Sequence, residues 1–109
     1  MKNPSLLFLW SMISEIIRNS TNNLDVIVDE PGDLQINTNE GRPFVRVRIQ
    51  RTHVGIYLQP LCYYPEVLPQ SLLERKTGKG TLRFRNEEDD LLSEISSLIE
   101  ACLTLIGHY

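Results

Sequence analysis

The chain has 109 residues, 41% of them hydrophobic and 23% charged, a composition that fits one globular domain over residues 1–109 and does not indicate disorder. No stretch approaches the roughly 18 apolar residues of a membrane span, so we expect no membrane partner. The net charge of −3 and the pI of about 5.3 argue against a basic nucleic-acid-binding protein.

An amphipathic helix is predicted at the start of the chain. Asn3 suits the N-cap and Pro4 the first helical position, and apolar residues then recur every three or four positions to about Arg18. This stripe consists of Leu6, Leu9, Trp10, Ile13, Ile16 and Ile17. Leu7 and Phe8 flank it, so the first turns are apolar almost all round. We therefore expect them to contact either two elements or a partner.

Short strands are predicted next, because β-branched residues alternate with polar ones between turn signals. They cover residues 24–28, 34–38, 45–50 and 54–58. The third is the clearest, since apolar and polar residues alternate strictly from Val45 to Gln50. Prolines at positions 60, 65 and 69 exclude a continued central strand after the fourth.

The last third of the chain is predicted to hold a short helix, a strand and a long helix. Ser71 and Glu74 form a capping-box pattern for a helix that ends near Gly78. A strand over residues 81–85 follows, and then a helix that opens in the acid-rich run at 86–90 and stops at the glycine at 107.

Together these elements predict an α+β fold: an antiparallel β-sheet of about five strands, with the N- and C-terminal helices packed on one face. Consecutive strands with close turns favour antiparallel pairing. The expected core comprises Val45, Val47, Ile49, Leu82 and Phe84 on the sheet and Trp10, Ile13, Ile95, Leu98 and Cys102 on the helices.

Positive charge is concentrated in the middle of the chain. Nine of the eleven Lys and Arg residues lie within residues 42–85, which hold two acids and so carry +7. Residues 1–41 carry −4 and residues 86–109 carry −6. Charge asymmetry of this kind concerns the choice of partner and says nothing about the fold.

Strand periodicity places four of these cations on the sheet face opposite the helices. They are Arg46, Arg48, Arg83 and Arg85. Because arginine offers a fixed fork of donors to phosphate or carboxylate, we predict an anionic small molecule as ligand. Lys79, with the backbone of its flanking glycines, is a second predicted contact. Two alternatives stay open. The arginines could serve only the solubility of exposed strands, and the glycines could be explained by a helix C-cap and the turn that follows it.

One set of residues resembles a known family. It comprises His53, Val54, Tyr57, Leu58, Pro60, Pro65, Leu68, Ser71, Leu73, Arg75, Gly78, Lys79, Phe84 and a closing amphipathic helix. In this pattern the chain resembles the YdhG-like small bacterial domains, which are mostly of unknown function. The resemblance implies an α+β domain and no settled activity. Some relatives have been likened to frataxin, an iron carrier with an acidic ridge on its first helix. The predicted first helix here carries the single acid Glu15, which argues against iron handling.

No catalytic, cofactor or metal motif is evident, so we expect no enzyme. By residue type, His53, Cys62 and His108 are the only candidates for acid–base or nucleophilic catalysis, and they form no recognisable catalytic motif. Cys62 and Cys102 each lie in an apolar stretch and are predicted to be reduced core thiols of an intracellular protein. The histidines and cysteines match no structural zinc spacing.

The sequence thus favours a small cytoplasmic binding module without catalysis. The apolar run near the N-terminus is interrupted by Glu15 and has no small-residue cleavage site, so secretion is not expected. The main alternative is a self-associating domain, a homodimer whose exposed patches include Leu7, Phe8 and residues 61–65. Frataxin-like metal handling is a further, weaker alternative.

Nucleic acid is not an expected partner, since no helix-turn-helix, zinc-finger or RNP1 signature is present.

Overall fold

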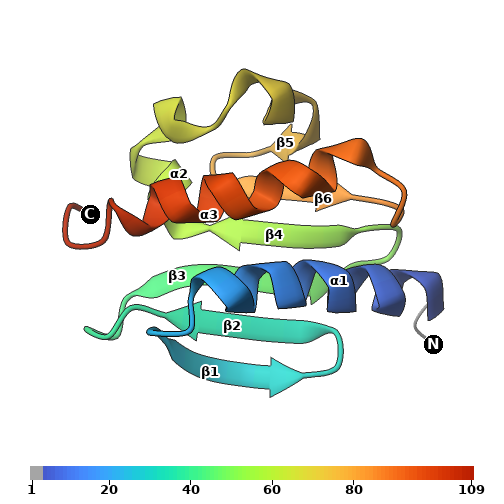
Figure 1. Ribbon diagram of the computed structural model, residues 1–109, viewed down its shortest axis with the longest axis horizontal. Helices are drawn as coiled ribbons and strands as arrows, with labels where there is room; N and C mark the ends of the chain where they lie inside the picture. Colours follow the sequence, from blue (N-terminus) through green and yellow to red (C-terminus); the bar gives the residue numbers. More distant parts are fainter. Residues whose placement is uncertain (1–3) are drawn as a thin grey trace.

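The computed structural model describes residues 4–109 and shows two helices lying side by side on one face of a β-sheet (Figure 1). The main elements are α1 (Pro4–Ser20), β1 (Asp25–Glu30), β2 (Asp33–Asn37), β3 (Pro43–Ile49), β4 (Val54–Leu58), α2 (Gln59–Tyr63), β5 (Lys76–Thr77), β6 (Thr81–Phe84) and α3 (Ile95–Leu103). Short 3-10 helices are η1 (Pro65–Val67), η2 (Gln70–Arg75) and η3 (Asp90–Glu94). No helix within the described range is long and apolar enough to cross a bilayer.

The sheet is antiparallel throughout, with the order β1-β2-β3-β4-β6-β5. The predicted α+β class, with N- and C-terminal helices packed together and on the sheet, is confirmed. Residues 4–109 contain six strands where about five were expected. The additional strand, β5, is two residues long, and strand periodicity gives no signal over so short a run.

The predicted core is formed as the alternation of residues in the strands requires. Val47 of β3 lies opposite Ile56 of β4, which in turn lies opposite Leu82 of β6, and all three side chains are fully buried. Ile49 is half-buried rather than buried, because β3 ends there. The Trp10 indole Nε1 donates a hydrogen bond of 2.9 Å to the Val47 carbonyl and so joins α1 to the centre of the sheet.

Helix α1 ends two residues beyond the predicted position, at Ser20, and the Thr21 hydroxyl donates to the Ile17 carbonyl at 2.8 Å. The predicted N-cap, Asn3, lies outside the described residues. Arg18 in the last turn forms an ion pair with Asp29 of β1. This contact anchors the helix terminus against the first edge of the sheet.

The capping box predicted at residues 71–74 is absent from this part of the described chain. The Ser71 hydroxyl donates to Glu94 at 2.6 Å, and the N-cap of η2 is Pro69, with no side-chain cap. The helix also ends at Arg75 instead of near Gly78, because the next two residues pair with β6. Gly78 has φ +69° and makes the turn between β5 and β6, a conformation that favours glycine.

The C-terminal helix begins later than predicted. Asp89 accepts a hydrogen bond of 2.9 Å from the Leu91 backbone N–H and acts as the N-cap of η3, from which α3 continues. The cap fixes the first turn, so Glu87 and Glu88 of the predicted opening stay in the preceding loop. Helix α3 ends at Leu103, and turns lead to Gly107.

Both cysteines were predicted to be buried, and this is correct for one of them. Cys102 is buried, and burial raises the pKa of its thiol to about 12. Cys62 is exposed, which contradicts its predicted place in the core. The single-turn helix α2 directs the neighbouring Leu61 inward instead, and that side chain is fully buried.

Candidate functional site

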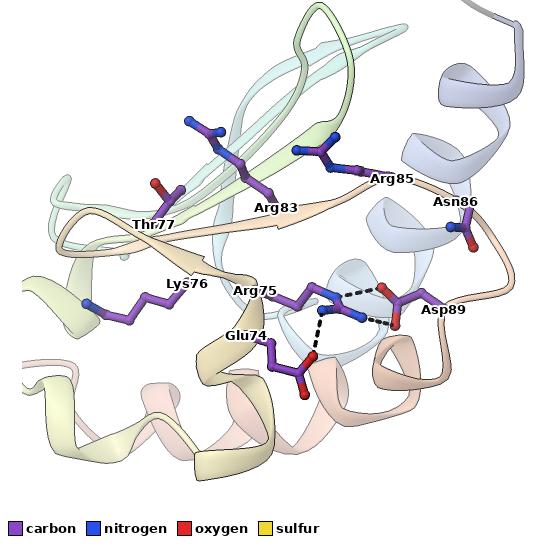
Figure 2. A pocket seen from close by; sticks show the side chains of 8 residues that line it. All are labelled: Glu74, Arg75, Lys76, Thr77, Arg83, Arg85, Asn86 and Asp89. Carbon is purple, nitrogen blue, oxygen red and sulfur yellow. Dashed lines mark hydrogen bonds and ion pairs between the residues drawn. The ribbon is translucent and has the colours of Figure 1, made fainter.

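The open face of the sheet carries the predicted arginines. Arg48 of β3 and Arg83 of β6 both lie directly opposite Gly55 of β4, so the three residues form one row across the sheet. Arg46 lies in the adjacent row, opposite Tyr57. Figure 2 shows that the side chains of Arg83 and Arg85 extend to the same side of β6. The prediction that these side chains lie opposite the buried ones agrees with the structure.

Arg46 is already paired within the domain. Its Nε and Nη2 donate to the two carboxylate oxygens of Asp33 on β2, at 3.0 and 2.9 Å. This hydrogen bond raises the pKa of Arg46. Arg48 Nε lies 3.9 Å from the same carboxylate, because Asp33 and Arg48 are partners across the strands. The bidentate fork of Arg46 is therefore occupied by a carboxylate of the domain itself.

A second internal ion pair joins Arg75, at the end of η2, to Asp89 (Figure 2). Arg75 Nε donates to Asp89 Oδ2 at 2.7 Å and Nη2 donates to Oδ1 at 3.2 Å. The Asp89 side chain is only 8% exposed. Hydrogen bonding from Arg75, and then from the Leu91 N–H, holds the pKa of Asp89 below its ordinary value. A weaker contact of 3.4 Å links Arg75 to Glu74.

Arg83 and Arg85 differ from these paired arginines. Within residues 4–109 no carboxylate lies within ion-pair distance of either guanidinium. Both side chains are exposed. Arg83 lies in β6, whereas Arg85 follows the strand, which ends at Phe84 and not at the predicted residue 85. Their neighbour His53, in the β3–β4 turn, has a lowered pKa, chiefly through partial burial and then through the charges of Arg83 and Arg85. This corner of the sheet thus has unbalanced positive charge.

A polar cleft of about 330 Å³ lies beside these two arginines. Its lining residues are Glu74, Arg75, Lys76, Thr77, Arg83, Arg85, Asn86 and Asp89 (Figure 2). Four cationic side chains face two carboxylates there. Because Arg75 is paired with both acids, the excess positive charge resides on Lys76 and the two unpaired arginines. Lys76 Nζ donates to the Gly78 carbonyl at 2.7 Å, whereas neither Arg83 nor Arg85 has an ion-pair partner within residues 4–109.

A second depression, of about 250 Å³, lies on the open sheet face and shares Thr77 and Arg83 with the cleft. The rings of His53 and Tyr57 contribute to its lining. Its remaining lining residues are Gln50, Gly78 and Thr81. The two depressions thus meet at Arg83.

Lys79, the fifth predicted contact, lies exposed in the β5–β6 turn, outside the lining of both depressions. The Gly80 carbonyl in this turn accepts a hydrogen bond of 2.7 Å from the Leu58 N–H, which ties the turn to β4. The structure therefore brings Arg83 and Arg85 to one cleft and places Lys79 beside it. Arg48 lies across Gly55 from Arg83.

Sequence reasoning missed Thr77 and Asn86 as lining residues and Asp89 as the partner of Arg75. The position of Asp89 at the start of a helix is a sequence signal for a cap, but it does not identify the arginine. Within residues 4–109 no group of three or more His, Cys, Asp or Glu side chains could hold a metal ion. Comparison of the chain with protein-family models, curated proteins and solved structures gives no match. The resemblance to the YdhG-like domains stays a prediction.

Proposed function

We propose that this domain is a small cytoplasmic binding module without catalytic activity, and that it binds an anionic small molecule beside Arg83 and Arg85. The observation that supports this proposal is the contrast between two classes of arginine. Arg46 and Arg75 are neutralised by carboxylates of the domain, whereas Arg83 and Arg85 have no such partner within residues 4–109. Like charges held close together repel, and an anion between them relieves the repulsion.

The chemistry of the cleft favours phosphate or carboxylate. Guanidinium groups donate paired hydrogen bonds to either anion, and these charge-assisted bonds are stronger than neutral ones. The Thr77 hydroxyl and the Asn86 amide lie in the same lining and supply neutral hydrogen-bonding groups. The volume of about 330 Å³ is at the lower end of the range for small-molecule sites, which suits a small ligand.

Titration of the protein with inorganic phosphate at low ionic strength, followed by calorimetry, tests the proposal. We expect saturable binding to the wild type, weakened about 10-fold or more by Arg83→Gln or Arg85→Gln, since a hydrogen bond to a charged group contributes about 1.5–3 kcal/mol. Arg42→Gln is the matched control. It removes the same charge before β3, at the opposite end of the sheet from Arg85, where Arg42 stacks on Tyr109 at 5.2 Å.

The control variant should bind phosphate within about 3-fold of the wild type, because screening over a Debye length of about 8 Å limits the effect of a distant charge. Absence of saturable binding to the wild type would refute the proposal. Equal weakening by Arg42→Gln would also refute it, because binding would then reflect net charge alone. The arginines would in that case serve solubility.

Self-association is a second candidate function, favoured by the apolar surface of α1. Phe8 is 57% exposed and Leu7 is 36% exposed, on a helix whose other large apolar residues are mostly buried. We expect a homodimer with these side chains at the contact. Light scattering should report a dimer for the wild type and a monomer for Phe8→Glu. A wild-type protein that stays monomeric at high concentration would eliminate this candidate.

A further inference from the structure

We infer that the anion bound at Arg83 carries a planar aromatic group, which stacks on the ring of Tyr57. This inference rests on the anion site proposed above and adds the class of molecule that the site selects. A nucleoside phosphate is one compound of this class. The argument depends on where the tyrosine ring lies, on what surrounds it and on the adjoining depression.

The Tyr57 ring lies low on the open face of the sheet, over Gly55 of its own strand. A Cβ atom at Gly55 would lie 3.2 Å from the tyrosine Oη and 3.3 Å from its Cε2 and Cζ. The missing side chain at Gly55 therefore makes the space that the ring covers. Gln50 Nε2 donates a hydrogen bond of 3.1 Å to the Tyr57 hydroxyl and so fixes the ring in this position. A fixed aromatic ring loses little conformational freedom on binding a ligand.

Cations lie on both sides of this ring. Gly55 is the direct cross-strand partner of Arg48 on β3 and of Arg83 on β6. A ring over Gly55 is therefore flanked by two arginines in one row of the sheet. A flat group stacked on Tyr57 would lie beside the Arg83 guanidinium, within reach of the cleft that Arg83 and Arg85 line.

The depression that contains the tyrosine has the size and chemistry for such a group. Its volume is about 250 Å³, and its lining includes His53 as well as Tyr57. Partial burial, and then the charges of Arg83 and Arg85, lower the pKa of His53 and so disfavour a charged imidazolium in this depression. Because the two spaces share Arg83 and Thr77, one ligand can place its anion in the cleft and its flat group over Tyr57.

Comparative titration tests the inference. The probes are inorganic phosphate, ribose 5-phosphate, adenosine and adenosine 5′-monophosphate, and the proteins are the wild type, Tyr57→Leu, Tyr57→Phe and the Arg42→Gln control. We expect the wild type to bind the nucleotide about 10-fold more tightly than ribose 5-phosphate, as base stacking on an aromatic side chain does elsewhere. Tyr57→Leu should abolish this difference and leave phosphate binding within about 3-fold, whereas Tyr57→Phe and Arg42→Gln should keep it.

Nuclear magnetic resonance gives an independent readout that needs no variant. The nucleotide should shift the ring resonances of Tyr57 in the wild type, and ribose 5-phosphate should not. This measurement decides the matter even if Tyr57→Leu fails to fold, because Tyr57 also covers Gly55.

The outcomes separate this inference from the proposed function. Equal affinity for the nucleotide and ribose 5-phosphate, with no ring shifts, would overturn the stacking inference and leave the anion site standing. Adenosine that binds as tightly as its phosphate would overturn the anion site and, with it, the inference that the ligand is an anion, because the ring alone would then account for binding. Failure of every probe to bind would overturn both, and Tyr57 would then serve only to fill the space above a glycine.

Discussion

Replacing Asp89 with asparagine should destabilise the domain far more than replacing Glu74 with glutamine, although both acids contact Arg75. The Asp89 carboxylate accepts two hydrogen bonds from Arg75, at 2.7 and 3.2 Å, and one from the Leu91 N–H. Its side chain is 8% exposed, whereas that of Glu74 is 76% exposed and lies 3.4 Å from the same guanidinium. Each substitution therefore removes one negative charge that contacts Arg75. The charge is nearly buried at Asp89 and exposed to solvent at Glu74.

The expected magnitudes follow from this difference in burial. Asparagine is nearly as good an N-cap as aspartate, so Asp89→Asn keeps the cap of η3 and loses mainly the charge-assisted bonds to Arg75. After allowance for the partial exposure of Arg75, we expect a loss of about 2 kcal/mol in the free energy of unfolding. That corresponds to a fall of roughly 8 °C in Tm for a domain of this size. Glu74→Gln should change stability by less than about 0.5 kcal/mol, as exposed pairs do.

Urea denaturation followed by circular dichroism measures both variants, and pH dependence adds a second check. Because Arg75 lowers the pKa of Asp89 in the folded state, the stabilisation is present above the unfolded pKa of about 3.9 and is lost as the pH falls through the folded value. The difference in the free energy of unfolding between the wild type and Asp89→Asn should therefore become smaller at low pH. A loss below about 0.5 kcal/mol at pH 7, or an equal loss in Glu74→Gln, would refute the reasoning.

Three further predictions concern the thiols, the β5–β6 turn and the histidine beside the arginines. A thiol reagent should modify Cys62 quickly in the native protein and Cys102 only after unfolding, because burial raises the pKa of the latter to about 12; two fast thiols would contradict this. Gly80→Ala should lower the free energy of unfolding by about 1–3 kcal/mol, because its Cβ would lie 2.6 Å from a β4 carbonyl oxygen; wild-type stability in urea would disprove the predicted clash. The pKa of His53, measured by nuclear magnetic resonance, should be below its ordinary value and should rise in Arg85→Gln; no rise would show that the two side chains do not interact.

The outline of the fold could be predicted because burial imposes a strict period on the strands. Val45 and Val47 alternate with Arg46 and Arg48 in the sequence, and the structure places the first pair inside and the second pair on the open face. A one-residue slip would reverse every side chain, so the pattern fixes the register of β3 strongly. The same reasoning placed Arg83 on the open face.

The features that sequence reasoning missed depend on contacts between distant residues. Strand β5 exists because Lys76 and Thr77 pair with β6, and two residues are too few to show a period. The Arg46 guanidinium is paired with Asp33, which lies thirteen residues earlier in the chain. The pairing of β2 with β3 brings the two residues together. Sequence could name the arginines that share a face. It could not say which of them the domain itself neutralises.

Cys62 illustrates a different limit. Its neighbours are apolar, and composition alone favours a buried thiol. The direction of its side chain is set by α2, a single turn of helix that points Leu61 inward and leaves the next residue outside. So short a helix has no repeated stripe from which the buried side could be read.

The order of the strands also determines how the fold assembles. Strands β1 to β4 follow one another through short turns, whereas β6 reaches β4 only after the chain has passed through residues 59–80. Closing a longer loop costs more entropy, and contacts between distant residues form later in folding. We therefore expect β6, which carries Arg83, to pair with the sheet last during folding and to unfold first. We expect the amide hydrogens of β6 to exchange with solvent faster than those of β3, and a bound ligand to slow that exchange.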